Sequence, residues 1–381
     1  MEFVKDPNDT RRVVIIDVSG LFYKYAYGGA KALSATILVD GVPTRVDTTL
    51  PTYVIKQIHR WSNYGVNPTV VCFDGKGATR SRKAYFAKHN GIREGAEPIG
   101  YKGSRESQDS RFYDGINITQ NLLMQGGVCC LKADGYEADD LIKAAVDKAK
   151  EQYPHLPIDV VTGDVDLAPL VDDQVSVFLT SKKLTWAEDK SIEKRNYMQL
   201  RPYNYQEYIE GLSAYKTLEV PYNTVLLTKL LRGDKSDEIP AYPKFTPKKY
   251  KALITSLQED GYDLSDICRY DNPIPVISYR GSEEPIPEEL IESTPREQKM
   301  IKFKEPACLT KLCNILSEYL DEDIVEHVRF IYNGINLNGA FVGLPDGFNR
   351  RPATVTVNID GYSAGQLQQA VSVVQIKLPF K

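Results

Sequence analysis

Carboxylates crowd one short stretch of this chain. Residues 130–150 read CLKADGYEADDLIKAAVDKAK, where Glu137, Asp139 and Asp140 fall within four residues and Asp134 lies just upstream. Two unit charges about 4 Å apart repel by roughly 1 kcal/mol in water and by about 4 kcal/mol at an effective dielectric constant near 20. Asp134 could cap the apolar helix that follows, with Glu137 completing a capping box, and the helix dipole favours acids there. Capping does not account for Asp139 and Asp140, so their partners must lie elsewhere in the chain.

Six more carboxylates follow expected strand ends or share one helical turn. They are Asp17, Asp74, Asp164, Asp166, Asp234 and Asp237. A lone aspartate at a strand end is commonly a turn residue or a cap, but ligand sites of parallel sheets lie beyond the same carboxyl ends. Carboxylate oxygens are natural ligands of Mg²⁺ and Mn²⁺. Two such ions roughly 4 Å apart can activate a water and stabilise the leaving oxygen of a phosphodiester cleavage.

The elements that position these acids alternate between strand and helix. Strands are expected at the apolar runs that end near Asp17, Asp74, Asp134 and Asp164 and at QVSVFLTS, and residues 51–65 have helical spacing. Continuous apolar runs separated by helices are typical of a parallel sheet covered on both faces. We therefore predict an α/β fold with a mainly parallel central sheet and helices on both faces.

We expect three regions along the chain. Residues 1–190 form the α/β core, residues 191–345 are mainly helical with a surface loop at 270–298, and residues 346–381 form a C-terminal extension. Within the core, residues 75–127 are expected to make a partly helical excursion over the sheet edge. Residues 76–105 contain eight Lys or Arg and two Glu, a local net charge of +6. An acidic focus beside a basic patch suits a polyanion held over metal ions.

Bulk properties exclude several classes of protein. The 381 residues carry a net charge of −4 at pH 7, which argues against a general nucleic-acid coat. The six cysteines form no CxxC pair and there are four histidines, so we expect reduced thiols in a cytoplasm and no zinc site. The apolar runs are shorter than the roughly 20 residues of a membrane helix, and the polar N-terminus MEFVKDPNDTRR has no signal region.

Six segments in fixed order resemble one enzyme family. They are IDVSG, VVCFDG, YKGSR, GYEADDLI, TGDVDLAPLV and LLRGDKSDEIP, and they cover about residues 12 to 250. Together they resemble the 5′ nuclease, or flap endonuclease, family, which includes phage 5′→3′ exonucleases, phage ribonuclease H enzymes and the 5′ nuclease domain of bacterial DNA polymerase I. The resemblance implies a PIN-like core with a helical arch at about residues 75–127.

The resemblance also assigns the acids to two metal ions. It implies that one group gathers the first ion, namely Asp17, Asp74, Glu137 and Asp139. A second group gathers the other ion, namely Asp140, Asp164, Asp166, Asp234 and Asp237. In this assignment Asp140 lies between the two ions, which are expected to be Mg²⁺, with Mn²⁺ able to substitute.

Basic residues are implied to handle the nucleic acid. Lys102 and Arg105 match the arch-base residues that steer the scissile phosphate, where a cation stabilises developing charge, and Tyr101 is placed to stack on a base. Five more cations would line the arch and contact backbone phosphates. These are Arg80, Arg82, Lys83, Lys88 and Arg93. The alternative for each cation is a solvated surface charge.

Two further segments carry expected contacts. Residues 225–255 match the family's helix-hairpin-helix, where Lys244, Lys248 and Lys249 would bind duplex backbone. The stretch IPAYPKFTPKKY contains no glycine, so the family's potassium site is not expected in its usual form. At the end of the chain, Gln375, Ile376, Leu378 and Phe380 resemble peptides that dock on sliding clamps; the alternative is a final strand packed on the domain.

The resemblance implies a Mg²⁺-dependent, structure-specific 5′ nuclease. It would remove RNA primers and 5′ flaps in DNA replication or repair, and we expect it to be phage-encoded and to act in the bacterial host cytoplasm. Its expected partners are DNA with flaps, nicks or RNA primers, and a sliding clamp or single-strand-binding protein. The alternatives are a PIN-type ribonuclease, which would lack the Asp234 and Asp237 pair, and a non-catalytic junction-binding replisome protein.

Overall fold

The computed structural model describes thirteen segments of the chain. They are residues 11–27, 33–39, 42–63, 65–89, 100–104, 110–133, 135–179, 198–200, 224–243, 245–271, 274–279, 282–285 and 301–336. Several residues singled out above lie outside them: Asp134, Arg93, Arg105, Lys244, Gln375, Ile376, Leu378 and Phe380. The predicted boundaries at residues 190 and 345 also fall outside, so the division into three regions stays a prediction.

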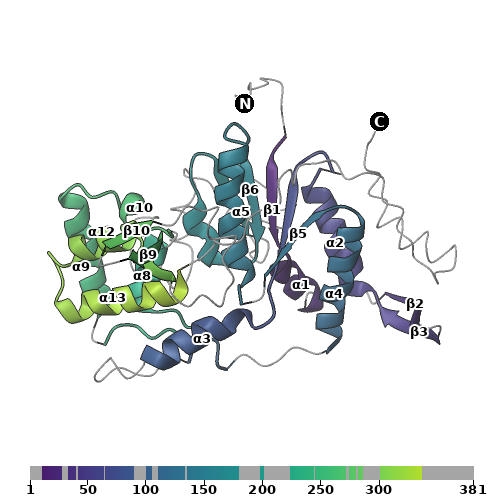
Figure 1. Cartoon of the computed structure of the whole chain (residues 1–381), viewed down its shortest axis with the longest axis horizontal. Helices are drawn as coiled ribbons and strands as arrows, with labels where there is room; N and C mark the ends of the chain where they lie inside the picture. The colour runs from purple at the N-terminus through teal and green to yellow at the C-terminus, as the bar shows by residue number, and fades with distance from the viewer. Residues whose placement is uncertain are drawn as a thin grey trace.

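A six-stranded sheet forms the centre of the molecule (Figure 1). Its order is β5-β4-β1-β6-β7-β8, and the first five strands are parallel, whereas β8 pairs antiparallel to β7. The strands are β1 (Val13–Asp17), β4 (Thr69–Phe73), β5 (Cys129–Lys132), β6 (Ile158–Thr162), β7 (Val175–Leu179) and β8 (Met198–Leu200). The prediction of a mainly parallel sheet is confirmed, because strands buried on both faces carry the continuous apolar runs seen in the sequence.

Helices cover both faces of this sheet. Alternate residues of β1 enter two hydrophobic cores, Val13 and Ile15 on one face and Val14 and Ile16 on the other. On the first face lies α5 (Ala138–Gln152), and on the second lie α1 (Val18–Tyr27), α2 (Thr49–Trp61) and α4 (Ser110–Gln125) (Figure 1). This alternation follows from the two-residue repeat of a strand.

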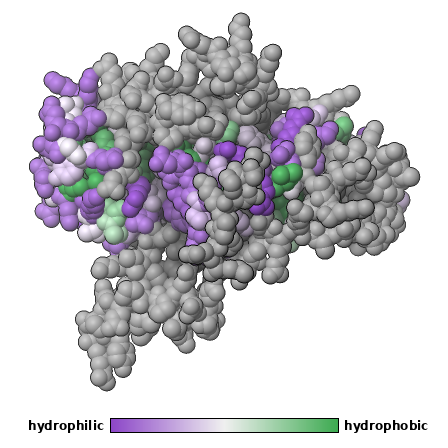
Figure 2. All heavy atoms as spheres, turned by 90° about the horizontal axis from the view of Figure 1, so that it is seen from above, coloured by the Kyte–Doolittle hydropathy of each residue, from purple (hydrophilic) through white to green (hydrophobic). Residues whose placement is uncertain are grey.

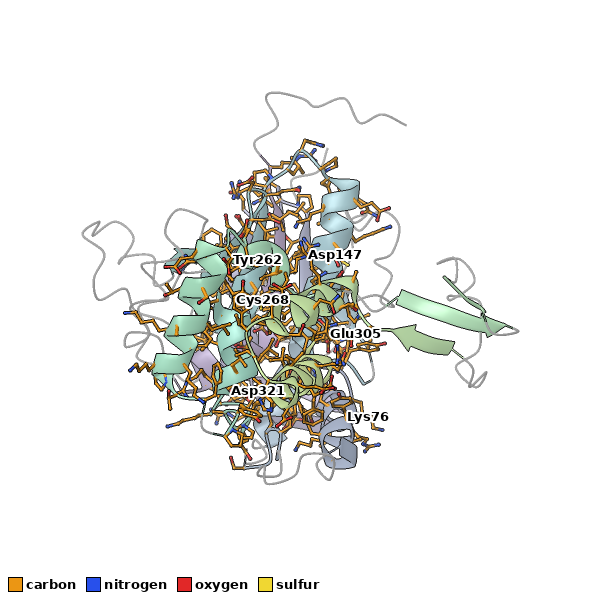
Figure 3. All side chains as sticks on the ribbon, turned by 90° about the vertical axis from the view of Figure 1, so that its left-hand side faces the viewer. Lys76, Asp147, Tyr262, Cys268, Glu305 and Asp321 are labelled. Carbon is orange, nitrogen blue, oxygen red and sulfur yellow. The ribbon has the colours of Figure 1, made fainter. Side chains whose placement is uncertain are left out.

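The helical region packs against the α5 face. It contains α8 (Val225–Arg232), α9 (Pro247–Glu259), α10 (Leu264–Ile267), α12 (Ala307–Leu316) and α13 (Glu322–Ile335). Their buried residues belong to the same hydrophobic core as α5, and Figure 3 shows Cys268 among these helices. All six cysteines are free thiols, four of them buried.

Two short sheets were not predicted. The hairpin β2 (Ser34–Val39) and β3 (Val42–Asp47) follows α1 in the chain, and β10 (Ser282–Pro285), β9 (Ile274–Tyr279) and β11 (Ile301–Lys304) form an antiparallel sheet. The expectation of a surface loop over residues 270–298 is therefore wrong for its first part. The segment IPVISY is rich in β-branched residues, which favour strands despite the neighbouring prolines.

The predicted excursion after β4 begins as a helix, α3 (Ala78–His89), and its later segment 100–104 is a turn. Seen from above, the described surface is largely hydrophilic with scattered apolar residues (Figure 2). Among the described helices, none is long and apolar enough to cross a membrane.

Candidate active site

The predicted carboxylates meet at the carboxyl edge of the sheet. Asp17 ends β1, Asp74 follows β4 and Asp164 follows β6, and these three strands are neighbours in the sheet. Parallel neighbours end on the same side, so residues far apart in sequence come together there. The 3₁₀ helix η2 (Val165–Leu170) adds Asp166, and the start of α5 adds Glu137, Asp139 and Asp140.

Hydrogen bonds fix the orientation of the strand-end acids. Asp17 accepts from the Thr162 hydroxyl at 2.9 Å and from the Gly20 N–H at 3.2 Å. Asp74 accepts from the Ser19 hydroxyl and from the Ala138 N–H, both at 2.8 Å. A Cβ atom at Gly20 would lie 2.7 Å from the backbone nitrogen of Gly163, so this close approach of α1 to the end of β6 requires glycine.

The helix start differs from the predicted capping pattern. Glu137, not Asp134, is the N-cap of α5, and its N–H donates to the Asp140 carboxylate at 3.0 Å. Gly135 has a φ of +84°, so the chain turns there and the helix can begin only after it. The expectation that Asp134 caps the helix and Glu137 completes the capping box is therefore corrected. Glu137 is the N-cap, and Asp140 completes the box by accepting from its N–H.

Three side chains from the excursion surround Glu137. The Arg82 guanidinium lies 2.8 Å from Glu137 and 2.7 Å from Asp140, and Lys102 Nζ lies 3.1 Å from both Glu137 oxygens. The Tyr101 hydroxyl donates to Glu137 at 3.2 Å and accepts from Arg82 at 3.1 Å. Burial alone would raise the pKa of Glu137, but the charges of Arg82 and Lys102 outweigh it and lower that pKa.

A second group of acids surrounds Lys229, a residue that was not among the predicted site residues. Carboxylate oxygens of Asp166, Asp234 and Asp237 lie within 4.8 Å of one another. The buried Lys229 ammonium of α8 contacts Asp166, and lies 3.0 Å from Asp234 and 2.9 Å from Asp237. The available signal was a lysine within the otherwise apolar run VLLTKLL, where a buried charge requires partners. Burial opposes the charge of Lys229, but the three carboxylates hold its pKa well above the ordinary value.

Three of the acids have raised pKa values, because burial and neighbouring carboxylates outweigh the nearby cations. Burial and the neighbouring charge of Asp74 raise the pKa of Asp17 to about 6. Burial raises the pKa of Asp166 to about 7, against the opposing charge of Lys229. Burial and the charges of Asp164 and Asp17 raise the pKa of Asp139 well above its usual range. Clustered oxygen donors that repel one another are a chemical fit for hard divalent cations.

The predicted nucleic-acid contacts divide into exposed and buried groups. Arg80 and Lys83 are exposed on α3, and Lys248 and Lys249 are exposed in the first turn of α9, whose N-cap is Thr246. Arg82 instead points into the acids, and Lys88 lies in α3 with its side chain outside the description.

Tyr101 also departs from its predicted role. Only 1% of this residue is exposed. Its ring stacks on Phe86 at 5.4 Å between ring centres, and its hydroxyl donates a hydrogen bond to Glu137. The expectation that a base stacks on Tyr101 therefore does not hold in this arrangement, where both the ring and the hydroxyl are already engaged within the protein.

The described residues thus form an α/β domain whose mainly parallel sheet has carboxylates gathered at its carboxyl edge. Residues 12–196 match the family described as 5′-3′ exonuclease, N-terminal resolvase-like domain. The match spans just under half of the chain.

Part of this chain is similar to bacterial DNA polymerase I proteins. DNA polymerase I of Mycobacterium tuberculosis (strain ATCC 25618 / H37Rv) is 32% identical over 148 residues, which are 38% of this chain and 14% of the relative. DNA polymerase I of Caldicellulosiruptor bescii is 24% identical over 259 residues, or 67% of this chain and 26% of the relative. Among solved structures, the T5 D15 protein co-crystallised with metal ions has a TM-score of 0.44 at 14% identity, covering 85% of this chain and 90% of that one.

Proposed function

We propose that this chain is a divalent-metal-dependent 5′ nuclease that hydrolyses phosphodiester bonds at 5′ flaps, nicks and RNA primers during DNA replication or repair. The observation that carries the proposal is the gathering of carboxylates at the carboxyl edge of the sheet, with Asp234 and Asp237 next to Asp166 and with Lys102 close to Glu137 and Asp237. The match of residues 12–196 to the 5'-3' exonuclease N-terminal domain family supports the same reaction class.

The acids divide into two donor groups for metal ions. Asp17, Asp74, Glu137 and Asp139 would hold one ion, and the remaining five acids, Asp140, Asp164, Asp166, Asp234 and Asp237, would hold another. When bound, two Mg²⁺ ions supply an activated water and a counter-charge for the leaving oxygen. Because Arg82 and Lys229 already pair with several of these acids, these two cations compete with metal for the same oxygens.

The chain's own cations would place the substrate. Lys102 lies between Glu137 and Asp237, where its ammonium can bind a phosphate brought to the acids. Arg80 and Lys83 on α3 would contact the strand that passes the arch, and Lys248 and Lys249 on α9 would contact duplex backbone. Contacts to phosphates position the nucleic acid without reading its sequence. Arg105, Lys244 and clamp docking through Gln375, Leu378 and Phe380 remain part of the proposal, although they lie outside the described residues.

A substrate panel tests this function. A 5′-labelled flap, a nicked duplex, an RNA–DNA hybrid and a single-stranded RNA are each incubated with Mg²⁺ or with EDTA. We expect Mg²⁺-dependent cleavage of the flap and of the RNA–DNA hybrid. Cleavage of single-stranded RNA alone would favour a PIN-type ribonuclease, and binding of junctions without metal-dependent cleavage of any substrate would favour a non-catalytic junction binder.

A double substitution separates catalysis from binding. Asp164→Asn with Asp166→Asn removes two anionic ligands while keeping side-chain size, so cleavage should fall by more than about a thousandfold and junction binding should persist. Gel-based cleavage and fluorescence anisotropy report the two properties, and circular dichroism checks the fold. Loss of binding together with cleavage would contradict a purely catalytic role for these acids.

A further inference from the structure

We propose that Glu238 is a positioning residue, which fastens the 100–104 segment to the loop 234–239 and thereby sets Lys102 between the two acid groups. The inference rests on the proposed nuclease function of that site. Glu238 and Ser104 were not among the site residues predicted from the sequence.

Three hydrogen bonds join the two segments. The Glu238 carboxylate accepts from the Ser104 N–H at 2.6 Å and from the Ser104 hydroxyl at 2.5 Å. The Lys102 N–H donates to the backbone carbonyl of Asp237 at 3.1 Å. We call this set of contacts the 104–238 clip. It joins residues more than a hundred positions apart, so it holds the 100–104 segment to the loop that bears Asp234 and Asp237.

The backbone at the 104–238 clip is strained on both sides. Among the described residues, the non-glycine residues with positive φ are Asn63, Lys102 and Glu238. Asn63 lies in a turn after α2, but Lys102 (φ +51°) and Glu238 (φ +58°) lie in the two segments that the clip joins. Such conformations cost of order 1–3 kcal/mol each and persist where surrounding contacts enforce them. The Ser104–Glu238 and Lys102–Asp237 hydrogen bonds join the two segments that carry these strained residues, so we infer that they enforce this geometry.

Close packing leaves little freedom in the segment. A Cβ at Gly103 would lie 2.5 Å from the Gly100 carbonyl oxygen, and Cβ atoms at Gly100 and Gly103 would lie 3.1 Å and 3.3 Å from a Glu238 oxygen. The turn is therefore folded tightly on itself and against Glu238. With its backbone fixed there, Lys102 extends its ammonium to 3.1 Å from Glu137 and 3.8 Å from Asp237. Release of the clip would free Lys102 to leave the acids.

Single-turnover cleavage of a 5′ flap with Mg²⁺ measures the effect. Glu238→Ala should slow cleavage by about tenfold or more, since a misplacement of about 1 Å can cost up to a hundredfold. Flap binding in EDTA and the melting temperature should stay close to wild type. Glu238→Gln keeps an acceptor for the Ser104 N–H and should restore most of the rate. Glu151→Ala, at the far end of α5 from Glu137, is the matched control and should change nothing.

Coupling to Lys102 decides between positioning and other roles. In a Lys102→Ala background, Glu238→Ala should add less than about a twofold loss, because both changes remove the same effect. Independent, multiplying losses would overturn the proposal. A Glu238→Gln variant as slow as Glu238→Ala would also overturn it and would instead assign Glu238 a role through its charge.

Amide hydrogen exchange tests the positioning role of Glu238 separately from the proposed nuclease function. In the metal-free protein, Glu238→Ala should speed amide exchange at Lys102 and Ser104 and leave β1 unchanged. If the wild type cleaves no substrate, the nuclease proposal fails while this measurement still tests the clip. Unchanged exchange at both amides would contradict the clip even in an active nuclease.

Discussion

At the level of single side chains, the acid edge is held together by cations that the protein supplies itself. Arg82 and Lys102 pair with Glu137, and Lys229 pairs with Asp166, Asp234 and Asp237. A buried charge without a partner is costly, so each group of acids is stable without metal only while its cation remains in place. We expect any metal ion that binds these acids to compete with the same cations.

Lys229→Met should reveal this dual role. Without metal, the variant removes the cation that the three carboxylates share and should lose about 3–5 kcal/mol of unfolding free energy. Millimolar Mg²⁺ should recover much of the loss, since a divalent cation can take over the neutralisation. Denaturant unfolding with EDTA or with MgCl₂ measures both values.

Lys143→Met is the matched control for this prediction. Lys143 is also buried on a helix, but its partner Asp147 is 39% exposed, so the change should cost less than about 1 kcal/mol. Mg²⁺ should not affect that value. A Lys229→Met protein that is equally unstable with and without Mg²⁺ would show that the lysine acts only as a structural ion-pair partner.

Among the secondary-structure elements, α13 supports the helix that carries Arg82. Phe86 of α3 is fully buried, stacks on Tyr101 and meets Phe330 of α13 edge-on at 5.6 Å between ring centres. The Tyr85 hydroxyl donates to the Phe330 carbonyl at 3.2 Å. Gly334 makes room for this contact, because a Cβ there would lie 2.3 Å from a Phe86 ring atom. The late helix α13 therefore braces the start of the excursion and, through Tyr101, the Glu137 cluster.

Gly334→Ala should destabilise the protein although alanine favours helices. The added methyl group collides with the buried Phe86 ring, and overpacking of this kind costs about 1–3 kcal/mol. Gly115→Ala in α4 is the control: its Cβ would meet Leu50 and Phe22 at 3.4 Å, an ordinary contact, so it should gain up to about 1 kcal/mol. Thermal unfolding measures both, and Phe86→Leu should relieve the Gly334→Ala defect. If Gly334→Ala leaves the melting temperature unchanged, the contact between Gly334 and Phe86 is not as tight as described.

Across the whole molecule, one hydrophobic core joins the sheet to the helical region. Val13 and Ile15 of β1 and the buried apolar residues of α5, α8, α9 and α13 belong to one cluster. This continuity brings Asp234 and Asp237, which follow α8, to the acids at the ends of β1 and β6. The site is therefore a property of the assembled fold, and cations bound there should stabilise all of it.

Mg²⁺ should raise the melting temperature, and more so at high pH. At about a hundred times the dissociation constant, a bound ligand adds about 2.7 kcal/mol. Asp17 and Asp166, with pKa values raised to about 6 and 7, hold protons at low pH that metal must displace. These pKa values exceed the unfolded value of about 3.9, so the folded state holds protons that the unfolded state has lost. The stability that the two carboxyl groups contribute without metal is therefore lost as the pH rises from about 3.9 through their folded-state pKa values.

The shift with Mg²⁺ should therefore be larger at about pH 8 than at about pH 5.5, where both carboxyls are largely protonated. Differential scanning fluorimetry with MgCl₂ or EDTA measures it at each pH. The Asp164→Asn, Asp166→Asn protein should show a smaller shift at both. Equal shifts of the wild type at both pH values would contradict competition between protons and metal.

The sequence by itself determined the parallel sheet and the acids at its edge. Buried parallel strands appear as continuous apolar runs, and the aspartates that end them must share one side of the sheet, so Asp17, Asp74 and Asp164 could be grouped without coordinates. Only the tertiary structure decided which cations face those acids. The short α3 has no clear apolar stripe, so nothing local shows that Arg82 turns inward while Lys83 stays in solvent. Tyr101, Lys229 and the Glu238 contact to Ser104 depend on α13, α8 and the 234–239 loop arriving from distant parts of the chain, which no local pattern encodes.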